Sequence, residues 1–94
     1  MIYNFLFSDS KEELERYVGD AIEFGVPAKD INEATDLAVR KALKEHYQYV
    51  LIFVWTPEPV AVKIVDAYFE VFRIFFEKMV RGGEDGEKGM AEAW

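Results

Sequence analysis

The pattern of hydrophobic and polar positions along the chain predicts two strands, one at the start of the chain and one near its middle. Residues 2–7 alternate between two faces and are rich in aromatic side chains, which is typical of a strand. Residues 47–55 form an almost unbroken run of β-branched and aromatic side chains, which predicts a strand buried on both faces. A continuation of the preceding helix is the alternative for this second run, because periodicity alone does not separate the two.

Two helices are predicted between these strands, each with its own start signal. Ser10 and Glu13 have the spacing of a capping box, in which each side chain satisfies the other residue's free backbone N–H. The helix that follows is expected to end near Gly25. Asp30 and Glu33 repeat the signal before a second helix, which is expected to end near His46. The stripe of small residues along this helix allows close approach to a sheet or another helix.

A third helix is predicted over residues 57–81. Thr56 and Pro57 form a typical helix start, and two consecutive glycines end the helix after residue 81. Between residues 60 and 80, 15 of 21 positions are apolar, and all but one of the charged side chains fall in an arc about 80° wide on a helical wheel. A surface helix needs an apolar stripe of only about 100°. This helix is therefore expected to be covered on more than one side.

These elements predict a small α/β (α+β) domain with the order β-α-α-β-α over residues 1–81. Residues 82–94 are rich in glycine and acidic side chains, which predicts a flexible C-terminal tail. Two strands alone make a marginal sheet, and an apolar strand is a liability at an open edge. We therefore expect the sheet to be completed by a second copy of the chain.

The apolar arc of the third helix predicts self-association. If half of the surplus arc stayed exposed, the apolar patch would measure on the order of 700 Å², more than a monomer usually tolerates. The alternative is that the helix is central in its own domain, with the other elements wrapped around it. We expect a homo-oligomer, with a dimer as its simplest form, and a different protein partner stays open. The expected interface consists of Val62, Val65, Tyr68, Phe69, Phe72, Phe76 and Met79.

Composition and charge narrow the class of protein. A hydrophobic content of 51% excludes intrinsic disorder for the body of the chain, and a net charge of -7 argues against nucleic-acid backbones or anionic lipid as the main partner. The chain has no cysteine, and it has no window of 18 uncharged residues, so neither a disulfide nor a transmembrane helix is expected. Without a basic leader it is expected to be cytoplasmic. Few Asn and Gln beside abundant Glu and Lys favour a thermophile.

No catalytic, cofactor-binding or metal site is predicted. His46 is the only histidine, and a histidine at a helix end more often caps or packs than acts as a general base. Ser8 and Ser10 are explained by the helix start that they form, and neither lies in a nucleophile elbow.

Three further features have a superficial likeness to ligand sites. Asp66 and Glu70 are spaced for one face of a helix, but Lys63 lies in the same row and favours an ion-paired seam over a metal site. Residues 82–89 contain glycines at loop spacing but lack the Gly-Lys-Ser/Thr ending of a phosphate loop. Trp94 would suit an aromatic anchor in a docking motif, although a frayed terminus is the simpler interpretation.

The sequence therefore favours a non-enzymatic, self-associating interaction module whose role is assembly or protein binding. The first alternative is a small-molecule binder or minor enzyme with an aromatic pocket between the sheet and the third helix. The second is a small dimeric regulator that contacts DNA through Arg40, Lys41 and Lys44, because two copies would double a weak basic patch.

Overall fold

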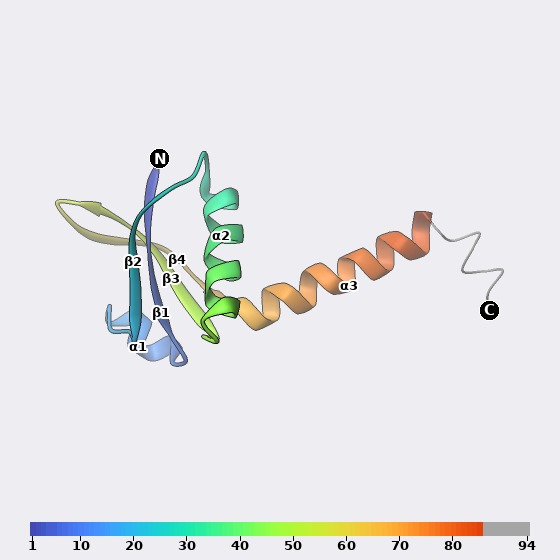
Figure 1. Cartoon of the computed structure of the whole chain (residues 1–94), viewed down its shortest axis with the longest axis horizontal. Helices are drawn as coiled ribbons and strands as arrows, with labels where there is room; N and C mark the ends of the chain where they lie inside the picture. The colour runs from blue at the N-terminus through green and yellow to red at the C-terminus, as the bar shows by residue number, and fades with distance from the viewer. Residues whose placement is uncertain (86–94) are drawn as a thin grey trace.

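The computed structural model describes residues 1–85 of the 94-residue chain, which belongs to the α+β class. One sheet has the strand order β2-β1-β3-β4 with every neighbouring pair antiparallel, and α2 lies against one of its faces (Figure 1). The elements are β1 (Ile2–Ser8), α1 (Lys11–Glu15), β2 (Ala21–Pro27), α2 (Ile31–Lys44), β3 (Tyr49–Thr56), β4 (Glu58–Asp66) and α3 (Ala67–Asp85).

The main core lies between the sheet and α2. Phe5 and Phe7 of β1 point to this side together with Val50 and Ile52 of β3, and all four are buried. The face of α2 that meets them consists of small residues, which lets the helix lie close to the sheet as its sequence predicts. These residues are Ala34, Ala38 and Ala42, each 0% exposed.

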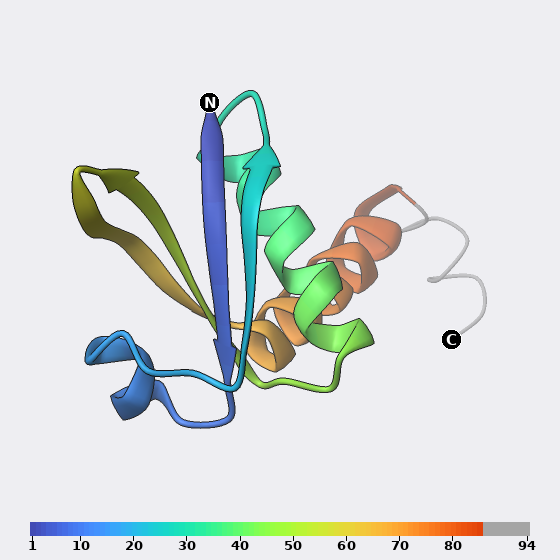
Figure 2. The same ribbon diagram turned by 60° about the vertical axis from the view of Figure 1, so that its left-hand side comes forward.

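The opposite face of the sheet is covered over only part of its area. The five-residue helix α1 places Leu14 against Leu6 and Leu51 in a second, smaller cluster. Beyond α1, the β3–β4 hairpin diverges from β1 toward its turn (Figure 2), and Trp55 near that turn is 59% exposed. Ile22 of the outer strand β2 is 47% exposed. This part of the sheet therefore presents apolar side chains to solvent.

A β-bulge in β2 is held by the side chain of Asn4. The pairing register of β1 with β2 shifts between Tyr3 and Phe5, so two residues of β2, one of them Gly25, oppose Asn4. Gly25 has φ 70°, and its N–H donates to Oδ1 of Asn4 at 3.0 Å. Nδ2 of Asn4 donates to the carbonyl of Phe53 at 3.4 Å. One buried amide thereby joins β2, β1 and β3.

Helices α1 and α2 both end in a left-handed residue that is not glycine. Tyr17 follows α1 with φ 58°, and His46 follows α2 with φ 64°. In each case the next N–H donates to the carbonyl five residues back, at 2.9 Å after α1 and 2.7 Å after α2. This bond is the long bond of a Schellman motif, in which the left-handed position usually belongs to glycine. The predicted end of the second helix near His46 is confirmed.

The predicted strands over residues 2–7 and 47–55 and the helix that Asp30 starts are confirmed, but the first helix is mostly wrong. It was expected to reach Gly25, yet α1 ends at Glu15 and residues 21–27 form β2. The chain turns back onto β1 because Gly19 allows a very close approach: a Cβ there would lie 2.7 Å from the carbonyl oxygen of Phe7. Pairing with β1 outweighs the helical spacing of the apolar residues.

The third helix was predicted from residue 57, but α3 begins at Ala67, so the prediction is wrong over residues 57–66. The predicted two-stranded sheet is wrong as well. Thr56 and Glu58 pair across a tight turn, and residues 58–66 return along β3 as the strand β4. The segment contains β-branched Val60, Val62 and Ile64, which favour a strand once β3 is available as a neighbour. All four strands of the sheet come from one chain, so no second copy is needed to complete it.

Helix α3 projects away from the domain, as Figure 1 shows. The molecule measures 57 Å along its longest axis but only 27 and 18 Å across. Among the described residues, α3 meets the rest of the domain through its first half, at whose start Ala67 is fully buried. Oδ1 of Asp66 caps this end by accepting from the N–H of Phe69 at 3.0 Å. The helix is therefore not enclosed by its own domain. It extends through Asp85, past the end predicted at residue 81.

Candidate interaction surface

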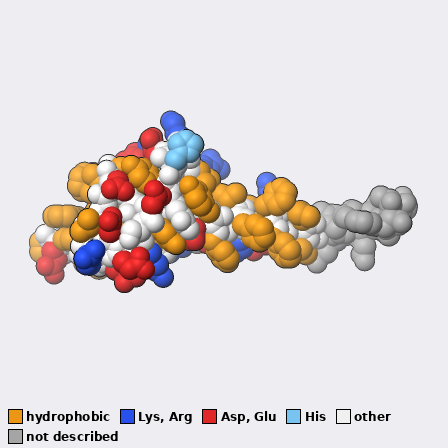
Figure 3. All heavy atoms as spheres, turned by 90° about the horizontal axis from the view of Figure 1, so that it is seen from below, with side chains coloured by type: hydrophobic (Ala, Val, Ile, Leu, Met, Phe, Trp, Pro, Cys, Tyr) orange, Lys and Arg blue, Asp and Glu red, His pale blue; other side chains and the backbone are white. Residues whose placement is uncertain are grey.

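Helix α3 carries a continuous exposed apolar surface on the side turned away from α2. Its side chains are between 46% and 66% exposed, and Figure 3 shows hydrophobic atoms along the projecting helix. We call this surface the aromatic face; it consists of Tyr68, Phe69, Phe72, Phe75, Phe76, Met79 and Val80. At 100° per residue these positions span roughly 140° of the helix surface. The surface is both wide and long enough to receive a helix.

The opposite side of α3 faces its own domain. Val71 and Ile74 meet Val39 and Leu43 of α2 across a groove of about 310 Å³, with Asp36 and Arg40 of α2 also lining it. Val71 and Ile74 are only 40% and 38% exposed, less than any member of the aromatic face. The domain therefore fixes the rotation of α3 about its axis, and this rotation turns the aromatic residues outward.

A row of charged residues borders the aromatic face, and its arginine is ion-paired within α3. Arg73 donates to Oε2 of Glu70 at 2.8 Å and to Oε1 of Glu77 at 2.7 Å. The hydrogen bond to Glu70, followed by the negative charges of Glu70 and Glu77, raises the pKa of Arg73 above its ordinary value. Lys63 and Asp66, which were predicted in the same row, belong to β4 instead. The remaining row sets no requirement for a charged partner.

The structure separates the predicted interface residues into two groups. Five of them lie on the aromatic face: Tyr68, Phe69, Phe72, Phe76 and Met79. Val65 is 4% exposed inside the protein's own core, and Val62 lies on β4 at 43% exposure. The prediction did not include Phe75 and Val80, because the rotation of α3 was unknown. Their spacing from Tyr68 and Phe76 would place them on the same face of any helix that begins near residue 67.

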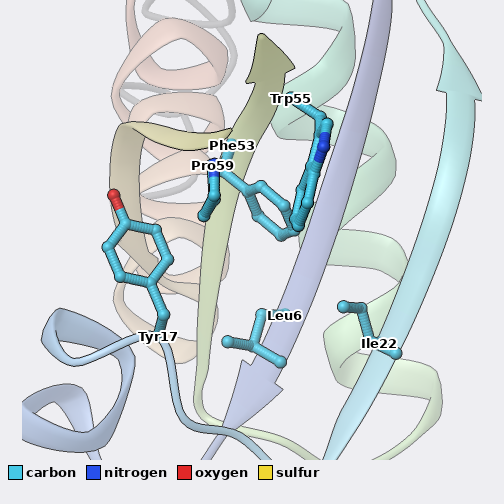
Figure 4. Close-up of a pocket in the computed structure, with 6 residues that line it drawn as sticks. All are labelled: Leu6, Tyr17, Ile22, Phe53, Trp55 and Pro59. Carbon is cyan, nitrogen blue, oxygen red and sulfur yellow. The ribbon is translucent and has the colours of Figure 1, made fainter. Parts of the chain in front are cut away.

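A second apolar surface lies on the open face of the sheet, as a hollow of about 240 Å³ beside α1 (Figure 4). Its walls are Leu6, Tyr17, Ile22, Phe53, Trp55 and Pro59. The ring of Tyr17 stands edge-on to that of Phe53 with centroids 6.4 Å apart, and its Oη accepts from the N–H of Ala61 at 3.0 Å. The predicted aromatic pocket was expected beside the third helix, whereas this hollow lies near the first.

The other residues considered for chemistry have local structural roles. Oγ of Ser10 accepts from the N–H of Glu13 at 3.3 Å, which is one half of the predicted capping box. The other half is replaced, because the N–H of Ser10 donates to Oγ of Ser8 at 3.0 Å, and Oγ of Ser8 donates in turn to Oε2 of Glu13 at 3.1 Å. In the basic cluster on α2, Lys41 is paired with Glu23 of β2 at 2.8 Å. Within residues 1–85, no group of three or more His, Cys, Asp or Glu side chains is placed to hold a metal ion.

Two further points concern the limits of the described chain. No helix in the part of the chain that the structure describes is both long and apolar enough to cross a membrane. The predicted docking residue Trp94 and most of the predicted tail lie outside the described residues.

No family model, curated protein or solved structure matches this chain.

Proposed function

We propose that this protein is a self-associating interaction module that docks onto a second copy through the aromatic face of α3. The exposed area of that face supports the proposal. With 150–250 Å² for each large aromatic side chain, the fractional exposures amount to on the order of 700 Å². A typical monomer exposes at most about 300–600 Å² in its largest apolar patch. Two copies would together bury up to about 1,400 Å², within the 1,200–2,000 Å² range of specific interfaces.

The free energy available from this area exceeds the cost of association. At about 25 cal/mol per Å², burial of both faces is worth on the order of 30 kcal/mol, as an upper bound. Association costs roughly 4–15 kcal/mol in lost translation and rotation, with side-chain ordering in addition. Because the projecting part of α3 makes few contacts with its own domain, this area can be covered without unfolding any part of the sheet.

A second copy is the partner that this face suits best. Arg73 is already paired with Glu70 and Glu77, and Lys78 brings the sum of the charges at positions 67–80 to zero, so this part of the helix offers no net charge to select an acidic or basic partner. An apolar face that does not select its partner by charge can pack against an identical face. Closed two-fold dimers of this kind are the commonest assemblies of soluble proteins.

The test compares the wild-type protein with two charged variants of equally exposed phenylalanines. Phe72→Glu changes the aromatic face, where the side chain is 66% exposed, and Phe24→Glu changes β2, where it is 62% exposed. Light scattering coupled to size exclusion at micromolar concentration should give a multiple of 10.9 kDa for the wild type and for Phe24→Glu, but a monomer for Phe72→Glu. A monomeric wild type, or a Phe72→Glu variant with unchanged mass, would contradict the proposal.

A further inference from the structure

We infer that the two copies pair through antiparallel α3 helices, with the two-fold axis passing at the level of Ile74. This inference rests on the proposed function, because it specifies how the aromatic face meets a second copy. It makes α3 the shared centre of a dimer whose two domains lie at opposite ends of a helix pair.

The spacing of the aromatic face is that of a helix-pairing seam. Phe69, Phe72, Phe76 and Met79 follow one another at intervals of three, four and three residues, as do the a and d positions of a coiled coil. The rings of Phe72 and Phe76 already stack in the middle of the seam, with centroids 6.5 Å apart and planes inclined by 16°. These two side chains are therefore preordered as the centre of the contact.

This sequence of intervals is the same in both directions, so an antiparallel partner meets it in register. The midpoint of the four seam residues falls at position 74. With the two-fold axis there, Phe72 lies opposite the partner's Phe76, and Phe69 lies opposite the partner's Met79. Each of the four contacting pairs then joins a residue close to its own domain with a partner residue close to the far end of α3. The four pairs therefore have similar volume.

The flanks of the seam are also compatible with this orientation. Phe75 lies one residue from the two-fold axis and on one flank, so an antiparallel pair brings it beside the partner's Phe75 and buries both rings. On the other flank Arg73 lies near the partner's Arg73, but each guanidinium is neutralised by Glu70 and Glu77 of its own helix. The pair therefore buries the remaining aromatic surface without placing an unpaired guanidinium beside another.

The charge of the domain favours the antiparallel over the parallel arrangement. Residues 1–66 contain 12 acidic and 7 basic side chains, a net charge of -5, whereas the four charges at positions 67–80 cancel. A parallel pair would place both acidic domains at the same end of the helices. With the two-fold axis at the level of Ile74, an antiparallel pair separates the two copies of residue 67, where each domain joins α3, by about 21 Å along the axis. That distance exceeds the screening length of about 8 Å at physiological ionic strength.

Cysteine cross-linking distinguishes the two orientations, because the chain has no cysteine of its own. In the antiparallel pair the two copies of residue 69 are about 15 Å apart along the axis, and so are those of residue 79. A disulfide needs Cα atoms within about 7 Å. The single variants Phe69→Cys and Met79→Cys should therefore stay unlinked after oxidation, whereas the double variant should form linked dimers on a non-reducing gel.

The controls separate this inference from the proposed function. Each variant is first weighed by light scattering under reducing conditions, so that only assembled protein is oxidised. Cross-linking of either single variant, Phe69→Cys or Met79→Cys, would show a parallel pair, and an assembled double variant that does not link would place the contact elsewhere; both results overturn the inference. A monomeric wild type would overturn the proposed function together with it.

Discussion

Replacing Asn4 with leucine should test how the sheet is held together at the bulge in β2. The side chain of Asn4 is 6% exposed and makes the two hydrogen bonds that join its neighbours on either side. Leucine has a similar size but neither donates nor accepts a hydrogen bond. The substitution therefore leaves the N–H of Gly25 and the carbonyl of Phe53 without the partner that the native fold gives them.

The expected loss is about 2 kcal/mol in the free energy of unfolding. A hydrogen bond contributes roughly 0.5–1.5 kcal/mol net, and an unsatisfied buried group costs about 1–3 kcal/mol. The bond to the N–H of Gly25 is the stronger, at 3.0 Å, but Gly25 is exposed and water can replace part of it. The bond to Phe53 is buried but long, at 3.4 Å. For a domain of this size the loss corresponds to a decrease in Tm of roughly 10 °C.

Urea denaturation at one fixed protein concentration measures this loss, because self-association would make the midpoint depend on concentration. The matched control is Asn32→Leu, which makes the same chemical change at an exposed position of α2 and should alter the free energy of unfolding by less than about 0.5 kcal/mol. If Asn4→Leu were no more destabilising than Asn32→Leu, the side chain of Asn4 would not be holding the three strands together.

Two other substitutions test the backbone positions that define the fold. His46→Gly should raise the free energy of unfolding by about 1 kcal/mol, since φ 64° is unfavourable for a residue with a Cβ; a lower urea midpoint than that of the wild type would refute this. Gly19→Ala should lower the free energy of unfolding by about 1–3 kcal/mol, because the new methyl group would lie 2.7 Å from the carbonyl oxygen of Phe7. An unchanged thermal midpoint would show that the backbone at Gly19 can move aside.

The elements that the sequence predicts correctly are those with local signals. Asp30 caps α2, where its Oδ1 accepts from the N–H of Glu33 at 2.9 Å, and the apolar run from Val50 to Ile52 needs no partner to be recognised as a buried strand. The missed strands β2 and β4 depend on pairing with a neighbouring strand, which the spacing of apolar residues within one segment does not show. The charged residue Lys63 of β4 fits the helical row of Glu70, and only pairing with β3 shows that the two belong to different elements.

The apolar, aromatic character of the candidate surface could be predicted from the sequence, but the exact set of residues that form it could not. An excess of exposed phenylalanine on the last helix follows from the number of apolar positions alone. Which of them face outward depends on where α3 begins and on how its first turn contacts α2. Val65 shows the difference: it is apolar and near the helix, but it belongs to β4 and is buried in the core.

The hydrogen bond between Tyr17 and Ala61 has a consequence for how sheets of this protein can grow. Ala61 lies on β4, an outer strand, and its N–H is one of the donors that an added strand would use. Tyr17 already occupies that donor, and its ring also rests against Phe53. Edge-to-edge pairing of β4 with a strand of another molecule is therefore obstructed near the middle of β4. In a chain with so much exposed apolar surface, this obstruction steers association away from open-ended fibres and toward contacts that close.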